Sequence, residues 1–333
     1  MRVGIIGLGA IAPMHVNALL DCGQSIVALC DIEIEKCREI KEQFSCEKEL
    51  QNAEEYSDYK EMLDKANLDA VHICTPHYLH AEMICESLSR DINVLCEKPL
   101  AISFAQFDEI EKAVKASKAK LGISFQNRYN PTVITLKNYI ADKKVTCGTA
   151  NLVWKRDEKY YASGEWRGKM ATEGGGVMIN QAIHSLDILQ WLCGMPESVL
   201  AHVSNNSLKD TIEVEDTAFG IFSLENGRNF VVHATNAAKS SFPVYMAFNS
   251  GSDTIELSAD NLIVNGNFVT KENGEPIFGK TEWGSGHAIL IREYYEALKN
   301  GEKFPIDFYE ARNSIRLILK MYESNGSKIN IKN

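Results

Sequence analysis

The start of the chain constrains the fold most, because it predicts a strand, a glycine-rich turn, a helix and a second strand. A short apolar run at 2–6 leads into Gly7-Leu8-Gly9-Ala10-Ile11-Ala12, and another apolar run follows at 25–30. Short apolar runs are typical of strands buried on both faces of a parallel sheet. The turn matches G-x-G-x-x-G/A, in which the second glycine lets the backbone approach a pyrophosphate. This segment therefore predicts a dinucleotide-binding unit.

The predicted cofactor contacts begin at this turn, where a helix over 11–20 presents free N–H groups and a positive dipole end to phosphates. They are Gly7, Gly9, Ala10 and Ile11. Asp31 closes the second apolar run, 22 residues beyond Gly9, and a carboxylate at this spacing suits the ribose hydroxyls of NAD. A strand-end residue that caps the next helix is the alternative role for Asp31, and both roles can hold. Lys36 and Arg38 lie near enough to keep NADP as a second possible cofactor.

Strand and helix segments continue to alternate up to about residue 125. Strands are expected at 68–75, 92–96 and 120–125, and helices at 78–89 and 104–117. Strands that alternate with helices of this length predict a parallel sheet covered by helices. The expected fold class is α/β, with a doubly wound domain over 1–125.

The pattern changes after this point, and residues 126–333 are assigned to a second domain. Its expected helices are 131–141, 176–193, 286–299 and 307–323, and its expected strands are 145–155, 198–205, 215–224, 229–236, 243–249, 253–258 and 261–269. Asn226-Gly227 and Asn265-Gly266 are hairpin turn signals. Because strands joined by tight turns pair antiparallel, the second domain is expected to be α+β with an open meander.

Two predicted strand ends in the first domain carry residues suited to chemistry. Glu97-Lys98-Pro99 closes the apolar run at 92–96, and Thr75-Pro76, followed by His77, closes the run before it. A lysine at the carboxyl end of a buried strand is poorly placed for structure but well placed for function, because open α/β sheets bind ligands outside the carboxyl ends of their strands. The remaining predicted cofactor contacts are Thr75, Pro76, His77, Glu97 and Lys98.

The second domain carries a glycine-rich start to its long helix. Glu173-Gly174-Gly175-Gly176 precedes Asn180, His184 and Asp187. Spacings of four and three place Asn180 with His184, and His184 with Asp187, on one helical face. A lone histidine on such a helix is more often a core or capping residue, but the three glycines favour close approach of a ligand or of the other domain.

Other candidate substrate contacts flank this helix in sequence. Arg128 either grips an anionic group of the substrate or ties the domains together. Trp166 and Arg167, with Tyr160 and Tyr161, either stack on a sugar ring or pack their own loop. Among the other histidines, His15 and His80 are expected to be structural, and His287 is a further candidate for the cleft.

Composition excludes several classes of partner. The chain has 333 residues, enough for two domains, with a net charge of -10 and a pI of 5.4, so nucleic acid is not expected to bind. No apolar stretch is long enough to span a bilayer, and Met1-Arg2-Val3 enters a strand directly, so no membrane contact and no secretory signal are expected. The nine cysteines include no C-x-x-C pair, which favours reduced core thiols and a cytoplasmic location. No group of residues has metal-ligand spacing, so no metal is predicted.

The glycine turn, Thr75-Pro76, Glu97-Lys98-Pro99 and Gly174-Gly175-Gly176 with His184 together resemble the glucose-fructose oxidoreductase, inositol dehydrogenase and rhizopine catabolism (Gfo/Idh/MocA) family. The resemblance implies an N-terminal Rossmann domain and a C-terminal domain with a large, mostly antiparallel sheet, whose open face forms a homodimer or homotetramer. It implies NAD(P)-dependent oxidation of a sugar, polyol or sugar-derivative hydroxyl. It also implies that Lys98 and His184 face the nicotinamide and the substrate.

Removing hydride from a carbinol requires a base that takes the hydroxyl proton near neutral pH, and His184 meets that requirement with little tuning. Lys98 is then expected to orient and polarise the oxygen, and the reverse assignment also stays open. Many members of the family carry Asp where this chain has Asn180. An amide hydrogen-bonds a hydroxyl but takes no proton, so the change places more weight on His184 and favours a different substrate.

The sequence therefore leaves three functions open. The first is an NAD-dependent sugar or polyol dehydrogenase, or the same enzyme working as a reductase. The second is an NAD-dependent glycosidase that oxidises and re-reduces its substrate within one turnover. The third is a non-catalytic sensor of sugar or dinucleotide, which intact Lys98 and His184 disfavour.

Overall fold

The computed structural model describes residues 1–258, 260–271 and 284–331. The chain divides into two compact units. The first consists of Met1–Gln126 with His287–Arg312, and the second of Asn127–Gly286 with Asn313–Asn333. Within the described residues, no helix is long and apolar enough to cross a membrane.

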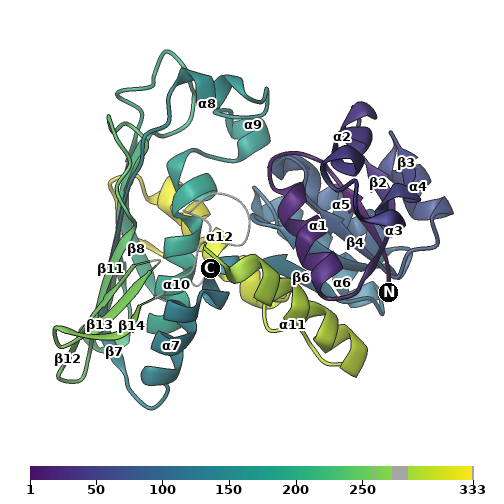
Figure 1. Cartoon of the computed structure of the whole chain (residues 1–333). Helices are drawn as coiled ribbons and strands as arrows, with labels where there is room; N and C mark the ends of the chain where they lie inside the picture. The colour runs from purple at the N-terminus through teal and green to yellow at the C-terminus, as the bar shows by residue number, and fades with distance from the viewer. Residues whose placement is uncertain (259, 272–283, 332–333) are drawn as a thin grey trace. The chain divides into compact units, whose positions relative to one another are not determined.

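The first unit is built on a six-stranded sheet in the order β3-β2-β1-β4-β5-β6, with every neighbouring pair parallel (Figure 1). The strands are β1 (Arg2–Ile6), β2 (Ser25–Cys30), β3 (Glu54–Tyr56), β4 (Ala70–Ile73), β5 (Asn93–Glu97) and β6 (Leu121–Ser124). This order reverses between β1 and β4, and ligands of such sheets bind outside the carboxyl ends of the strands at the reversal. The predicted doubly wound fold is confirmed, and β3 is a strand that the sequence pattern did not predict.

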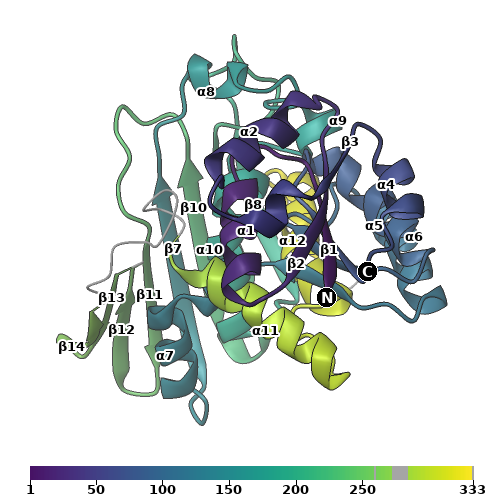
Figure 2. The same ribbon diagram turned by 45° about the vertical axis from the view of Figure 1, so that its right-hand side comes forward.

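Helices connect the parallel strands of this sheet. They are α1 (Ala12–Asp21), α2 (Glu35–Gln43), α3 (Lys48–Gln51), α4 (Tyr59–Lys65), α5 (His80–Leu88) and α6 (Phe104–Ala116), with 3-10 turns at His77–Leu79 and Gln126–Tyr129. Two of them begin at side-chain caps: Asp58 accepts from the Lys60 and Glu61 N–H groups before α4, and Ser103 accepts from the Gln106 N–H before α6. The helices α5 and α6 lie side by side (Figure 2).

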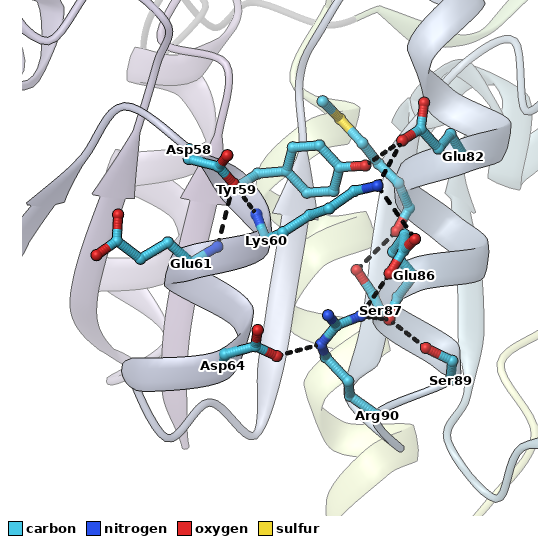
Figure 3. Close-up of polar contacts among 11 residues, drawn as sticks. Asp58, Tyr59, Lys60, Glu61, Asp64, Glu82, Glu86, Ser87, Ser89 and Arg90 are labelled. Carbon is cyan, nitrogen blue, oxygen red and sulfur yellow. Dashed lines mark hydrogen bonds and ion pairs between the residues drawn. The ribbon is translucent and has the colours of Figure 1, made fainter.

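A surface ion-pair network joins α4 to α5 (Figure 3). The Lys60 ammonium lies 3.0 Å from Glu82 and 3.2 Å from Glu86, and Arg90 lies 2.7 Å from Asp64. Exposed pairs of this kind contribute at most about 1 kcal/mol each. The network therefore orients the two helices rather than holding the unit together.

The segment 287–312 belongs to the first unit, which corrects the sequence-based assignment of all of 126–333 to the second domain. It contains most of α11 (Gly286–Asn300). The segment 287–312 belongs there because it packs closely against β6. A Cβ on Gly122 would lie 2.8 Å from the Tyr294 ring, and the Ile123 N–H donates to the Ile306 carbonyl at 2.9 Å. Gly122 thus makes room for a helix that arrives from far along the chain.

The second unit is built on a nine-stranded sheet in the order β14-β13-β12-β11-β7-β10-β9-β8-β15. Its strands are β7 (Val145–Val153), β8 (Ser198–Ser204), β9 (Thr217–Ser223), β10 (Asn229–Thr235), β11 (Tyr245–Ser250), β12 (Asp253–Leu257), β13 (Asn261–Val264), β14 (Asn267–Lys271) and β15 (Ile329–Asn330). Among the strands of this sheet that the structure describes, only β7 and β10 pair parallel. The predicted meander is interrupted because β7 lies between β10 and β11, and the predicted run 261–269 forms two strands joined at Asn265-Gly266, both with positive φ.

One face of this sheet is covered by helices. The helices of the unit are α7 (Pro131–Tyr139), α8 (Glu158–Ala162), α9 (Met170–Glu173), α10 (Ile183–Cys193) and most of α12 (Phe308–Ser324), with a 3-10 turn at Glu225–Gly227. α10 lies against β7 and β10 (Figure 1). Glycines allow the close packing: a Cβ on Gly148 would lie 3.0 Å from Leu189, and one on Gly220 would lie 3.0 Å from Met321.

The other face of the sheet is exposed and partly apolar. Side chains alternate between buried and exposed along β9 and β10, as expected for a sheet with one covered face. The exposed apolar side chains include Leu200 on β8, Phe219 and Ile221 on β9 and Tyr245 on β11. These four residues form what we call the open face.

Candidate active site

The glycine-rich turn has the backbone geometry that a pyrophosphate requires. Gly7 adopts φ +86°, and a Cβ there would lie 2.8 Å from the Cys74 carbonyl, so this position needs glycine. A Cβ on Gly9 would meet no protein atom within 4 Å, and Gly9 and Ala10 are exposed. Ala12 is fully buried, as close packing of α1 on the sheet demands. The turn fits a dinucleotide that lies over Gly9 at the start of α1.

Asp31 holds this turn in place. Its Oδ2 accepts from the Leu8 N–H at 2.8 Å, and its Oδ1 accepts from the Glu33 N–H at 3.0 Å. Lys36 lies 3.7 Å from Asp31 and 2.7 Å from Glu33, and Arg38 lies 2.9 Å from Glu35. Both nearby cations are thus engaged with carboxylates rather than poised for a 2′-phosphate.

His80 joins two of the predicted cofactor segments. Its Nδ1 lies 2.7 Å from the Pro99 carbonyl, and its Nε2 lies 2.8 Å from the Thr75 carbonyl. Burial lowers the pKa of His80, and a neutral ring donates to only one carbonyl at a time. His77 is also buried, with its ring centroid 6.0 Å from that of His80. The expected structural role of His80 therefore includes positioning the loop that carries Lys98.

Glu97 is the centre of a buried polar network rather than a residue on an open surface. Its carboxylate lies 3.1 Å from His15 Nε2 and 3.5 Å from His287 Nε2. Burial by itself raises the pKa of Glu97, but the hydrogen bonds from His15 and His287 outweigh it and hold that pKa well below its usual range. Burial likewise lowers the pKa of His15, but Cys74 and Glu97 outweigh it and raise that pKa above its usual value.

The network continues from His15 through His72 to Tyr295 on α11. His15 Nδ1 lies 2.7 Å from His72 Nδ1, and His72 Nε2 lies 3.0 Å from the Tyr295 hydroxyl. Burial and the neighbouring charge of His15 hold the pKa of His72 well below its usual value. A charged His15 that donates to Glu97 and to a neutral His72 satisfies all these contacts.

His15, Glu97 and His287 are also the one group of side chains, among the described residues, whose ligand atoms could hold a metal ion. The ligand atoms of His15, Glu97 and His287 lie within 4.8 Å of one another. Because the residues are far apart in sequence, no spacing pattern could show the group.

Lys98 follows Glu97 directly, is partly exposed, and precedes a cis peptide bond to Pro99. Burial is the main cause of the lowered pKa of both His80 and His287. The positive charge of the Lys98 ammonium lowers the pKa of each histidine further. The ammonium thus lies at the carboxyl end of β5, where the sheet places ligands.

The glycine motif of the second unit is explained by two partners that the sequence did not indicate. A Cβ on Gly175 would overlap the Tyr322 hydroxyl, and one on Gly176 would overlap the Glu215 carbonyl. The Glu215 carboxylate accepts from the N–H groups of Gly176 at 2.8 Å and Met178 at 3.0 Å, and from the Tyr322 hydroxyl at 3.0 Å. These glycines therefore let Glu215 cap the start of the helix.

The predicted helix 176–193 is not regular along its length. Met178–Ala182 forms a π-helical turn, and the α-helix α10 begins at Ile183. In the stretch from Glu173 to Gln190, every residue is buried except Asn180 and His184, which are partly exposed. Single π turns inside helices occur frequently at functional sites. The turn thus leaves the two predicted substrate residues as the accessible side chains of an otherwise buried segment.

Glu215 makes stability depend on pH in a defined window. Burial raises its pKa from 4.5 to about 7, although its hydrogen-bond donors oppose the rise. The folded state therefore binds the proton more tightly than the unfolded state, so stability falls as pH rises from 4.5 to about 7 and is level above that. We expect a loss of about 3 kcal/mol across this window from Glu215 alone.

Urea denaturation of wild type and Glu215→Gln at pH 5 and pH 8 tests this expectation. The wild-type free energy of unfolding should fall between the two values by about 3 kcal/mol more than that of the variant. An equal pH dependence in both proteins would contradict the assignment. The test compares how the free energy of unfolding changes with pH in each protein. A loss of stability that Glu215→Gln causes equally at both pH values therefore does not affect the result.

Arg128 is buried and fully engaged in the structure. Its Nε and Nη2 donate to Asp187 at 2.6 and 2.7 Å, and Ser314 donates to the same carboxylate at 2.6 Å. The exposed fractions of the Arg128 and Asp187 side chains are 4% and 1%. The Asp187 carboxylate is therefore engaged within the second unit, and the pair ties α10 to the segment before α7 and to α12.

The loop before the glycines forms a second cluster around Tyr160. The Tyr160 hydroxyl accepts from Arg167 at 2.7 Å, from Asn180 at 3.2 Å and from Gln181 at 3.0 Å. The Arg167 guanidinium also lies over the Trp166 ring, 4.5 Å from its centroid. Three of the predicted substrate residues, Trp166, Arg167 and Asn180, are thus joined in one network within the second unit.

Sequence reasoning missed several members of these networks. They are Arg156, Glu173 as a partner of Asn180, Glu215 and Tyr322. Only Arg156 carried a usable signal, since it lies four residues before Tyr160 among aromatic residues. Lys98 lies in the first unit and His184 in the second.

Residues 1–125 match the family described as "Oxidoreductase family, NAD-binding Rossmann fold", and residues 143–254 match the "GFO/IDH/MocA C-terminal domain". The chain belongs to the GFO/IDH/MocA family. Its first unit is accordingly an NAD-binding Rossmann domain, as the glycine turn predicted.

Relatives in the GFO/IDH/MocA family include named dehydrogenases. The chain is 27% identical over 195 residues to myo-inositol 2-dehydrogenase of Thermotoga maritima, covering 58% of this chain and 55% of that protein. It is 26% identical over 246 residues to D-glucoside 3-dehydrogenase of Escherichia coli K12, covering 68% of each. The chain thus spans about half the length of the inositol dehydrogenases that it matches.

Solved structures of the family extend the likeness over the whole chain. The WlbA dehydrogenase of Bordetella pertussis, in complex with NADH and UDP-GlcNAcA, is 25% identical with a TM-score of 0.84, covering 99% of this chain and 98% of that one. Levoglucosan dehydrogenase, in complex with NADH and levoglucosan, has a TM-score of 0.86 at 20% identity and full coverage of both chains, which shows a shared fold.

Proposed function

We propose that this protein is an NAD-dependent oxidoreductase that acts on a hydroxyl of a sugar, polyol or sugar derivative. The observation that carries the proposal is the accessibility of His184 and Asn180 in an otherwise buried helix of a family whose first domain binds NAD. The named activities of relatives on inositol and on glucosides support the substrate class.

His184 is the acid/base in this proposal. Bound NAD would supply the hydride acceptor for the carbinol carbon, and His184 takes the proton that leaves the oxygen. Lys98 donates a hydrogen bond to that oxygen and stabilises the charge that develops there. Asn180 is held by Tyr160 and Glu173, and offers its amide to a second hydroxyl.

Asp31 favours NAD over NADP, because its carboxylate is fixed at the glycine turn and the nearby cations pair with acids. Arg128 is assigned a structural role within the second unit rather than a substrate-gripping role, because Asp187 of the same unit occupies its guanidinium. Trp166 and Arg167 remain proposed substrate contacts.

The proposed assembly is a homodimer or homotetramer. The open face of the nine-stranded sheet presents Leu200, Phe219, Ile221 and Tyr245, which are between 37% and 44% exposed. An apolar sheet face of this kind is suited to burial against a second copy of the chain.

The experiment that tests the function is absorbance at 340 nm with NAD and NADP separately, across a panel of polyols, aldoses, uronates and glycosides. Reduction of NAD by one compound class supports the proposal, and a preference for NAD over NADP supports the role of Asp31. Cleavage of glycosides with no net NADH indicates the glycosidase instead. Binding of NAD without turnover of any compound indicates the sensor.

A further inference from the structure

Two arginines lie over one tyrosine ring in the loop before the glycine motif. The guanidinium carbons of Arg156 and Arg167 are 4.8 and 4.5 Å from the centroid of Tyr160. Both arginines are partly exposed. Stacking on an aromatic ring holds a guanidinium in a defined orientation while leaving its N–H edge available.

Their charges are not neutralised within the described chain. Arg156 donates to the Lys155 carbonyl at 3.0 Å, and Arg167 donates to the Tyr160 hydroxyl at 2.7 Å. Among the described residues, neither guanidinium forms an ion pair, and the Nε of each is buried without a hydrogen-bond partner. In a chain with a net charge of -10, two cations held close together without a carboxylate are an uncommon arrangement.

Two acidic residues that contact Tyr160 or its partner Asn180 have other partners. Glu173 accepts from the Gly168 N–H at 2.5 Å and from the Asn180 amide. Asp157 accepts from the Tyr160 N–H at 3.2 Å and lies 3.7 Å from Lys155. An external anion would therefore supply what both guanidiniums lack.

The cluster is connected to the proposed substrate site. The Tyr160 hydroxyl accepts from Asn180, which lies four residues before His184 and shares its accessibility. Asn180 and Arg167 donate to the same Tyr160 hydroxyl, and both guanidinium groups lie over the Tyr160 ring, so the arginines are one side chain away from Asn180. Guanidinium groups bind carboxylates and phosphates through paired, charge-assisted hydrogen bonds.

We propose that Arg156 and Arg167, oriented by Tyr160, form a subsite for an anionic substituent of the substrate, either a carboxylate or a phosphate of a sugar derivative. This inference rests on the proposed function, because it names the substrate class of the same site. It predicts that acidic sugars bind better than their neutral counterparts.

The test measures the binding of matched pairs of sugars to the NADH-saturated protein by isothermal titration calorimetry. The carboxylate is tested by comparing D-glucuronate with methyl glucoside. Phosphate groups are tested by comparing glucose 6-phosphate and UDP-glucose, each in turn, with glucose. At least one acidic probe should bind wild type about tenfold or more tightly than its neutral partner. The double variant Arg156→Gln/Arg167→Gln should lose that advantage, so that it binds the acidic and the neutral partner with similar affinity.

Lys155→Gln is the matched control, because it removes one exposed positive charge from the same loop and should leave the preference unchanged. NADH affinity and the thermal midpoint of each variant show that it is folded. If no acidic probe is preferred, or if the double variant retains the preference, the subsite is disproved while NAD-dependent turnover can still stand. If wild type fails to bind NADH, the proposed function itself fails.

Discussion

Replacing Lys98 with methionine is expected to lower kcat by about a thousandfold while leaving NADH affinity within a few fold of wild type. Methionine keeps the length of the side chain but removes the ammonium that we assign to the reacting oxygen. The contacts of the Glu97 carboxylate with His15 and His287 do not include that ammonium. The measurement is steady-state turnover by absorbance at 340 nm, with NADH binding followed by fluorescence.

Lys112→Met is the control for the loss of one positive charge, because Lys112 is exposed on α6 of the same unit. It should retain wild-type turnover. His184→Ala should cause a loss of similar size and should also remove from the pH dependence of kcat/KM the limb that the acid/base controls. Near-normal rates in both Lys98→Met and His184→Ala would rule out the proposed roles.

Asp187→Asn is expected to destabilise the protein by about 3–5 kcal/mol, because it leaves the buried Arg128 guanidinium without its countercharge. The carboxylate accepts three hydrogen bonds from Arg128 and Ser314, and both charged side chains are almost completely buried. An amide cannot accept two hydrogen bonds from the guanidinium and keep its own N–H groups satisfied there. The free energy of unfolding from urea denaturation at pH 7.5 measures the effect.

Two further variants separate this effect from general damage. Arg128→Met/Asp187→Leu removes both charges and should recover much of the lost stability, since replacing a buried pair by apolar residues is often neutral. Glu61→Gln breaks the exposed pair with Lys65, whose side chains are 48% and 65% exposed, and should cost less than about 1 kcal/mol. A small effect of Asp187→Asn would show that the pair does not hold α10.

The parts of the site that lie close together in sequence were predictable. Gly7, Gly9 and Asp31 were assigned from the spacing of one turn and one strand end, and the structure places Asp31 against the backbone of that turn. Helical spacing likewise grouped Asn180 with His184, and these are the two accessible residues of their segment. Periodicity also grouped Asp187 with His184, but a buried ion pair with Arg128 assigns Asp187 to the interior.

Contacts between distant segments could not be predicted in this way. The glycines before α10 suggested close approach of a ligand or of the other domain, but Glu215 and Tyr322 of the same unit occupy the space beside Gly175 and Gly176. His15 and His287 meet Glu97 although they lie at opposite ends of the chain. A glycine shows that something approaches closely but does not identify what approaches.

The sequence by itself determined the doubly wound first domain and the NAD turn, because both depend on local backbone preference and periodicity. The tertiary structure alone decided that β7 lies inside the second sheet, that α11 packs on the first unit, and that Glu97 is buried between histidines. It also brought Arg156 and Arg167 onto the same tyrosine ring. These arrangements depend on which distant surfaces are complementary in shape and charge, and local pattern carries no information about that complementarity.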